Sequence, residues 1–136
     1  MLKKIWIPLL LLLTLSNSAF AVDEQVPFGV VVQSSGDRAN LKRALILASN
    51  MHEVLDKSRF EVVVFGPNVK LLSAFSDELP LIQKAQAMGI KVIACGRSLK
   101  SFGLPQSDLA PEVEVVPFGA VHIIQRQLDG WQHITP

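Results

Sequence analysis

The 136-residue sequence has one cysteine, Cys95, and only three histidines. A single cysteine excludes an intramolecular disulfide, so its thiol is either free or bonded to another molecule. The histidines are scattered and no second thiol accompanies the first, so the chain lacks the ligand spacing of a metal site, and we expect neither a metal nor a cofactor. Neither a GxGxxG nor a GxxxxGKS/T pattern occurs, so no phosphate-binding motif supports a nucleotide site.

Neither sign of charge dominates the chain. Lysine and arginine together number 13 and aspartate and glutamate 12, which gives a formal net charge of +1. Two of the 13 basic residues, Lys3 and Lys4, lie in the first few residues, so the rest of the chain carries 11 basic against 12 acidic side chains. Because there is no basic stripe, nucleic acid is not an expected partner.

Apolar residues form one long run, Ile5 to Leu15, at the beginning of the chain. Two lysines precede the run, and Ser18–Ala21 ends in the small-x-small pattern that a signal peptidase accepts. The run is shorter than the ~20 residues that span a bilayer, and no cysteine follows it directly for lipid attachment. We therefore predict that Met1–Ala21 is a signal peptide, that no stable membrane anchor remains after cleavage, and that residues 22–136 form a periplasmic domain.

Hydrophobic periodicity in residues 22–136 alternates between short apolar runs typical of buried strands and the wider spacing typical of helices. The expected strands are Phe28–Val32, Phe60–Phe65, Ile90–Ala94, Val113–Val116 and Trp131–Ile134. The expected helical segments are Asn40–Leu55, Val69–Phe75, Leu79–Met88, Ser98–Leu109 (interrupted at Gly103 and Pro105) and Gly119–Leu128. Such alternation predicts a three-layer α/β/α sandwich with a mostly parallel five-stranded sheet, because parallel strands need crossover connections.

Sites in such sheets lie beyond the carboxyl ends of the strands. Four loops are expected there: Gln33–Asp37, Gly66–Asn68, Cys95–Lys100 and Pro117–Gly119. The first loop precedes a helix and in principle suits an anion, but Asp37 would repel phosphate. We therefore prefer an ordinary turn in which Asp37 caps the following helix.

Cys95 ends the third expected strand, and Gly96–Ser98 open the next helical segment. Backbone N–H groups, the positive end of a helix and the charges of Arg97 and Lys100 would lower the pKa of a thiol there and favour the reactive thiolate. The alternative is a buried cysteine that acts as a small hydrophobic side chain. Among the histidines, His122 in the first turn of the last helix is the one that could approach the thiol, but we expect each histidine to be a surface or packing residue.

The segment that contains Cys95, IACGRSLKSFGL, is similar to the cysteine segment of DsrE/DsrF-like proteins. Two more segments resemble that family in the right order. VVVFGPNVKLL at Val62–Leu72 resembles its second strand and glycine turn, and EVEVVPFGAVHIIQRQLDGWQHITP from Glu112 to Pro136 resembles its closing segment. The resemblance covers essentially all of residues 22–136 and implies a parallel five-stranded α/β/α fold, which agrees with the periodicity.

The resemblance also implies homo-oligomers, as trimers or hexamers, and a role in sulfur transfer. In that role Cys95 accepts sulfur as a persulfide and passes it to a partner protein, so the chain would be a sulfurtransferase or sulfur carrier with a protein donor or acceptor. The residues expected to bind the substrate beside Cys95 are Gly96, Arg97, Ser98, Gly66, Asn68 and Ser35.

The predicted export signal distinguishes this chain from sulfur-relay proteins of the cytoplasm. In an oxidising compartment a reactive thiol can be oxidised or captured as a mixed disulfide, and it would then no longer carry sulfur. Two other hypotheses therefore stay open. In one, the chain is a non-catalytic small-ligand-binding or oligomeric assembly subunit in which Cys95 is structural. In the other, it is a nucleotide-binding module, an idea that rests on α/β topology alone, and topology does not fix function.

Overall fold

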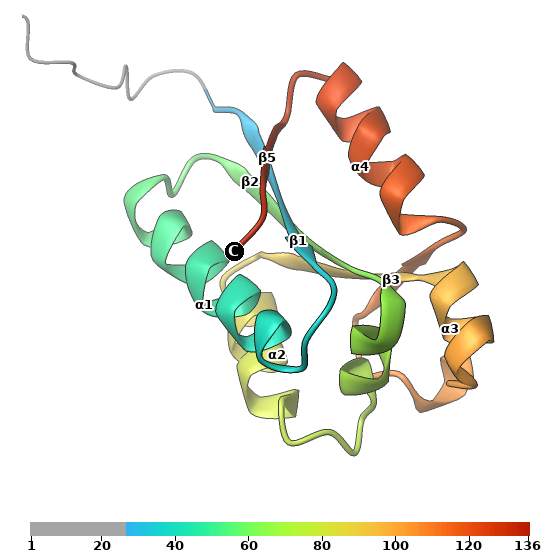
Figure 1. Ribbon diagram of the computed structural model, residues 1–136. Coiled ribbons are helices and arrows are strands. Elements are labelled where there is room, and N and C mark those ends of the chain that lie inside the picture. The colour runs from blue at the N-terminus through green and yellow to red at the C-terminus, as the bar shows by residue number, and fades with distance from the viewer. Residues whose placement is uncertain (1–26) are drawn as a thin grey trace, which may run out of the picture.

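The computed structural model describes residues 27–136, so the predicted signal peptide Met1–Ala21 lies outside the described residues. Helices flank both faces of a five-stranded sheet (Figure 1). The strands are β1 (Gly29–Ser34), β2 (Arg59–Val64), β3 (Lys91–Cys95), β4 (Glu114–Val116) and β5 (Gln132–Ile134). The helices are α1 (Ala39–Val54), α2 (Leu79–Ala87), α3 (Gly96–Phe102) and α4 (Gly119–Leu128), with 3-10 turns η1 (Gly66–Leu72) and η2 (Gln106–Asp108).

The strand order is β4-β3-β2-β1-β5, and every pairing between neighbours is parallel. From β1 to β4 the chain crosses the sheet in one direction, whereas β5 returns to the far side of β1. Because crossovers between parallel strands are right-handed, reversing the direction moves the connection to the opposite face. This rule puts α4 alone on one face, and α1 and α2 pack against the other (Figure 1). The predicted fold class is confirmed.

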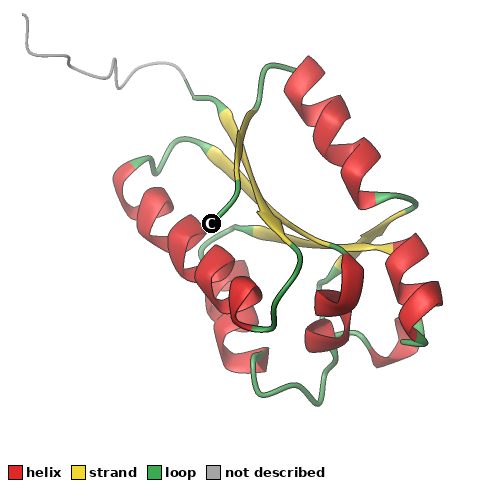
Figure 2. Cartoon of the chain, viewed as in Figure 1, coloured by secondary structure: helices red, strands yellow, loops and turns green. Residues whose placement is uncertain are grey.

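The two faces of the sheet have cores of unequal size. Successive side chains of a strand point to opposite faces, so Val62 packs with α1 and α2 while its neighbour Val63 packs beneath α4. Figure 2 shows the yellow sheet between these red helical layers. The larger core is on the α1 and α2 side. The buried members of the smaller core are Val31, Val63, Ile93, Ile123 and Trp131.

Helix α4 has few buried residues of its own. Gly119 and Ile123 are the buried ones, so a single large apolar side chain anchors it. Burying one such side chain stabilises a fold by roughly 1.5–3 kcal/mol. The stripe whose spacing predicted this helix faces outward instead: Val121, Ile124 and Leu128 are 42%, 56% and 83% exposed.

Two local expectations need correction. Asp37 does not cap α1, because the N-cap residue is Arg38 and no side chain caps the helix. The Asp37 carboxylate instead accepts a hydrogen bond from Arg43 at 3.0 Å, which lowers the pKa of Asp37. The helix expected from Ser98 begins earlier, directly after Cys95, and ends before Gly103, whose φ of 67° is left-handed.

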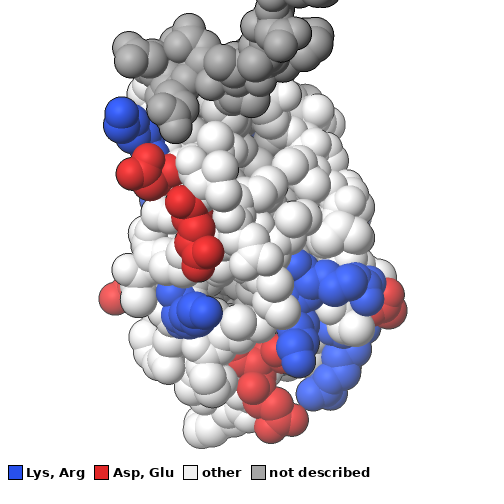
Figure 3. All heavy atoms as spheres, turned by 90° about the vertical axis from the view of Figure 1, so that its left-hand side faces the viewer, with Lys and Arg blue, Asp and Glu red and all other residues white. Residues whose placement is uncertain are grey.

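Charges of both signs occur on the face drawn in Figure 3, with uncharged surface between them. Within residues 27–136, no helix combines the length and apolar character needed to cross a membrane.

Candidate functional site

Cys95 lies at a junction of three elements. It is the last residue of β3 and the residue from which α3 begins, and its side chain is 1% exposed. Helix α4 starts against it: a Cβ added to Gly119 would lie 3.1 Å from the Cys95 Cβ and 3.3 Å from Val63 Cγ1. Only a residue without a side chain fits there unless its neighbours move, so Gly119 brings the first turn of α4 next to the thiol.

Hydrogen bonds to the sulfur outweigh the effect of burial. Burial raises the pKa of the Cys95 thiol, but hydrogen bonds from the Gly119 amide, from the Ser98 hydroxyl and amide, and from the Arg97 amide lower it, and the pKa lies below its usual value. These donors favour the thiolate, which is the nucleophilic form. The site is therefore chemically suited to reaction at sulfur.

The Ser98 hydroxyl links Cys95 to the end of β2. Its Oγ accepts a hydrogen bond from the Gly66 amide at 2.9 Å. A hydroxyl has one proton to donate, and with Gly66 as donor to the oxygen, that proton is available for the sulfur. Gly66 has a φ of 65°, a conformation that a glycine adopts without strain and that turns its N–H toward Ser98.

Arg97 and Gly96 tie the start of α3 to the segment before α4. The Arg97 amide donates to the Pro117 carbonyl at 3.2 Å, and the Arg97 guanidinium lies 5.4 Å from the centre of the Phe118 ring. Gly96 contributes by its lack of a side chain, since a Cβ there would lie 3.1 Å from the Val116 carbonyl oxygen. The three predicted residues after Cys95 thus surround it, through amides, one hydroxyl and a close backbone contact.

Asn68 and Ser35 are placed in a neighbouring network that holds the loop after β1. The buried Asn68 donates from Nδ2 to Ser34 Oγ at 3.2 Å and to the Asp37 carbonyl at 3.1 Å. The Ser35 amide donates to Asn40 Oδ1 at 3.0 Å. These hydrogen bonds join β1, α1 and η1, and none of them involves Cys95 or Ser98. Of the predicted residues Gly66, Asn68 and Ser35, only Gly66 contacts the Cys95 segment, through Ser98.

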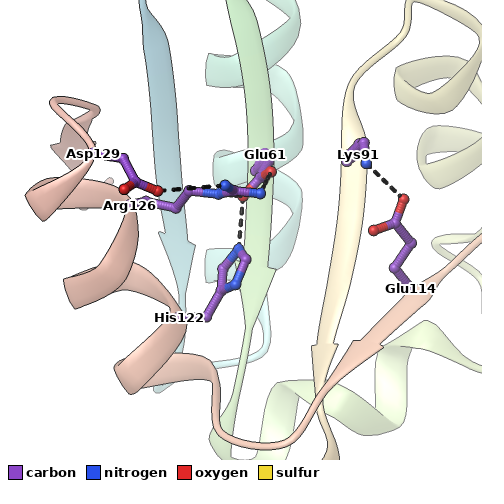
Figure 4. Close-up of polar contacts among 6 residues, drawn as sticks. All are labelled: Glu61, Lys91, Glu114, His122, Arg126 and Asp129. Atoms are coloured by element: carbon purple, nitrogen blue, oxygen red, sulfur yellow. Dashed lines mark hydrogen bonds and ion pairs between the residues drawn. The ribbon is translucent and has the colours of Figure 1, made fainter.

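A buried carboxylate, that of Glu61, lies on the face of the sheet that α4 covers (Figure 4). Glu61 of β2 is 1% exposed, and both its oxygens are satisfied from α4. His122 Nε2 donates to Oε2 at 2.7 Å, and Arg126 donates from Nε to Oε2 at 3.0 Å and from Nη2 to Oε1 at 2.7 Å. His122 therefore turns to Glu61 rather than to Cys95, and of the two roles considered from the sequence it takes the packing one.

These contacts keep the carboxylate charged. Burial raises the pKa of Glu61, but hydrogen bonds from Arg126 and His122 lower it below its usual value. The hydrogen bond to Glu61 in turn raises the pKa of Arg126. The Arg126 guanidinium also lies 4.6 Å from the centre of the Trp131 ring, so the partly exposed arginine packs against the smaller core while Glu61 is buried.

A hollow of about 290 Å³ lies beside the first turns of α4. Its lining residues are Val116, Pro117, Phe118, Val121, His122 and Gln125. Across residues 27–136 no cluster of three or more His, Cys, Asp or Glu side chains is arranged to hold a metal ion.

A parallel α/β/α protein with a hydrogen-bonded thiol at the end of its third strand is the class that this geometry defines. The chain belongs to the DsrE/DsrF-like family, which matches residues 27–136. No curated protein matches the sequence.

Three solved structures are similar to this chain. MTH1491 from Methanobacterium thermoautotrophicum, described as a protein of unknown function, is 27% identical with a TM-score of 0.74, covering 82% of this chain and 100% of its own. The ychN protein from E. coli is 16% identical with a TM-score of 0.69 and the same coverage. BT1422 from Bacteroides thetaiotaomicron, a conserved protein of unknown function, is 16% identical with a TM-score of 0.63, covering 79% of this chain and 94% of its own. The last two likenesses show the fold.

Proposed function

We propose that this protein is an exported sulfur carrier that holds sulfur as a persulfide on Cys95 and passes it to a partner protein. Membership of the DsrE/DsrF-like family supports this class of chemistry. The observation that carries the proposal is the position of Cys95 at the end of β3, at the start of α3 and against Gly119 of α4. Hydrogen bonding from Gly119 and Ser98 there lowers the pKa of the thiol although the side chain is buried.

Loading and unloading are two exchanges at sulfur, and neither needs an oxidant. The Cys95 thiolate attacks the terminal sulfur of a protonated donor persulfide; a new S–S bond forms, the donor's S–S bond breaks, and the donor leaves as a thiolate. The terminal sulfur keeps its proton. An acceptor thiolate then attacks that terminal sulfur, and Cys95 leaves as a thiolate. A thiol of low pKa leaves faster in such exchanges, so the donors on Gly119 and Ser98 assist unloading as well as loading.

Intact-mass measurement tests the proposal. After incubation with inorganic polysulfide and removal of the excess, the protein should gain ~32 Da, and dithiothreitol should remove the gain; two added oxygens have nearly the same mass, but a sulfinic acid resists reduction. Cys95→Ser is the matched control and should gain nothing. A wild-type protein that stays unmodified, or a gain that survives reduction, contradicts sulfur carriage at Cys95.

A second candidate is a non-catalytic small-ligand-binding or oligomeric assembly subunit in which Cys95 only packs. The 1% exposure of Cys95 is the observation in its favour. It predicts that the native thiol reacts with a small alkylating reagent no faster than a buried cysteine opened by global unfolding, and that Cys95→Ser keeps full activity in the native pathway. Rapid alkylation of the folded protein rules it out.

Export and self-association complete the proposal. We expect the mature protein to begin at Val22 in the periplasm, and N-terminal sequencing of that fraction checks this; protein that retains Met1 in the cytoplasm contradicts it.

The exposed apolar side chains of α4 support a homo-oligomer, a trimer or hexamer, because a contiguous apolar surface of this kind is a typical contact between subunits.

A further inference from the structure

We infer that Glu61 is a positioning residue for Cys95: by holding α4 through His122 and Arg126, it fixes the amide of Gly119 against the sulfur. The inference deepens the proposed function and rests on it for its relevance to sulfur transfer.

Glu61 and Cys95 lie at opposite ends of the strands that α4 covers. Glu61 pairs with Lys91 at the start of β3, and Cys95 ends that strand. At about 3.3 Å per residue, the two side chains are roughly 13 Å apart along the sheet. Between Gly119 and Arg126, α4 rises by about 10 Å. One helix therefore contacts Cys95 with its first residue, Gly119, and Glu61 with His122 and Arg126.

The hold on α4 is largely polar. Ile123 is the one large buried side chain of α4. Glu61, by contrast, accepts three hydrogen bonds from α4, one from His122 and two from the Nε and Nη2 atoms of Arg126. Charge-assisted, forked contacts of this kind are strong and directional. A neutral amide at this position has one acceptor oxygen in place of two, so at least one of the three hydrogen bonds to α4 is lost, and α4 then shifts to rehydrate the donor that loses its acceptor.

Other charged groups near Glu61 already have partners. Lys91 on β3 pairs with Glu114 on β4 at 3.0 Å, both about half exposed. Asp129 on α4 lies 3.8 Å from Arg126. Arg59, two residues before Glu61, stacks on Trp131, with its guanidinium 4.9 Å from the ring centre. Figure 4 shows the Glu61 and Glu114 pairs as separate groups. Glu61 is thus the carboxylate that receives His122.

The test is Glu61→Gln, with Glu114→Gln as the matched control. Both variants remove one negative charge from the same face, but Glu114 pairs with Lys91 rather than with α4. The readout is the pH dependence of iodoacetamide alkylation of Cys95. Loss of the Gly119 hydrogen bond should raise the apparent thiol pKa in Glu61→Gln by about one unit, so alkylation below that pKa becomes about tenfold slower. Glu114→Gln should match the wild type.

The direction of the shift separates positioning from simple electrostatics. Removing a nearby anion lowers a thiol pKa, and at a separation beyond the Debye length of about 10 Å the effect is small. A rise therefore supports the inference. A pKa in Glu61→Gln that equals or falls below that of the wild type overturns it.

A second variant covers a Glu61→Gln protein that does not fold, as judged by circular dichroism. Arg126→Lys keeps the positive charge but replaces the forked contact by a single point of attachment. It should raise the thiol pKa in the same direction, and an unchanged pKa in folded Arg126→Lys overturns the inference. Sulfur uptake by the wild type is measured separately, so a failure of sulfur carriage and a failure of positioning give different results.

Discussion

The Gly66 amide donates a hydrogen bond to Ser98 Oγ at 2.9 Å, and hydrogen bonding by Ser98 lowers the pKa of the Cys95 thiol. A backbone group at the end of β2 thereby orients a hydroxyl at the start of α3. The environment of the thiol at the end of β3 therefore depends on the end of the neighbouring strand β2 as well as on α3. This arrangement gives the first prediction.

Ser98→Ala should raise the pKa of the Cys95 thiol, because it removes a hydrogen bond that favours the thiolate. Such a bond contributes roughly 0.5–1.5 kcal/mol, which corresponds to a rise of about 0.4–1 unit. The pH dependence of thiolate absorbance in the ultraviolet measures it. Ser101→Ala, at an exposed position of the same helix, is the control and should leave the pKa unchanged.

Gly119→Ala should destabilise the fold and disturb the thiol together. The new methyl group would lie 3.1 Å from the Cys95 Cβ and 3.3 Å from Val63 Cγ1, so α4 or these neighbours must shift by a few tenths of an ångström. Overpacking of this kind costs about 1–3 kcal/mol, measurable as a lower midpoint in urea. Gln125→Ala, exposed on the same helix, should change stability by less than about 0.5 kcal/mol. Equal midpoints for the two variants would refute the close contact.

Acid should weaken the fold through Glu61. Because the pKa of Glu61 is depressed in the folded protein, its contribution is present above the unfolded-state pKa and is lost as pH falls through the folded pKa. Stability should therefore decrease below about pH 4.3, the usual pKa of glutamate. Urea unfolding at several pH values should show a shallower decrease in Glu61→Gln than in the wild type. Parallel curves would contradict a charged, hydrogen-bonded Glu61.

Charges on the outer face of α4 should dissociate the proposed homo-oligomer. Ile124 and Leu128 are 56% and 83% exposed and lie on one stripe of the helix. The double variant Ile124→Lys, Leu128→Lys should sediment as a monomer, since like charges would meet across the contact. Val54→Lys places a lysine at an apolar residue of α1 that is 78% exposed, and it should keep the wild-type mass. A wild type that sediments as a monomer contradicts the oligomer itself.

The alternation of strands and helices was predictable from the sequence because the β-strand cores are short apolar runs and the helices have clear spacing. For α4, however, the spacing of the apolar residues predicted the helix correctly but not the side that it buries. Its apolar stripe of Val121, Ile124 and Leu128 has helical spacing, yet it points to solvent. Spacing predicts that a helix forms, whereas the side that it buries depends on the polar contacts of His122 and Arg126, which involve a strand far away in the sequence.

The placement of Cys95 and its sequence neighbours at the end of a strand was predictable from the sequence, whereas their contacts with distant segments were not. Gly119, the first residue of α4, gives no sequence signal for its contact with Cys95, because its contribution comes from its backbone and from its lack of a side chain. Glu61 did leave a signal: it is a charged residue inside the apolar run of a central strand, and a buried charge requires a partner. The identity of that partner depends on the return of the chain through α4, which no local pattern specifies.

The burial of Cys95 also bears on which atom of a persulfide a second protein attacks. An acceptor thiol that attacks the terminal sulfur receives it, whereas attack on the inner sulfur would trap the two proteins as a mixed disulfide. In the proposed persulfide the inner sulfur would be the Cys95 sulfur, which is buried with its residue under the first turn of α4, and the terminal sulfur would lie about 2 Å beyond it. The junction of α3 and α4 would therefore impose regioselectivity, because it shields the atom whose attack is unproductive.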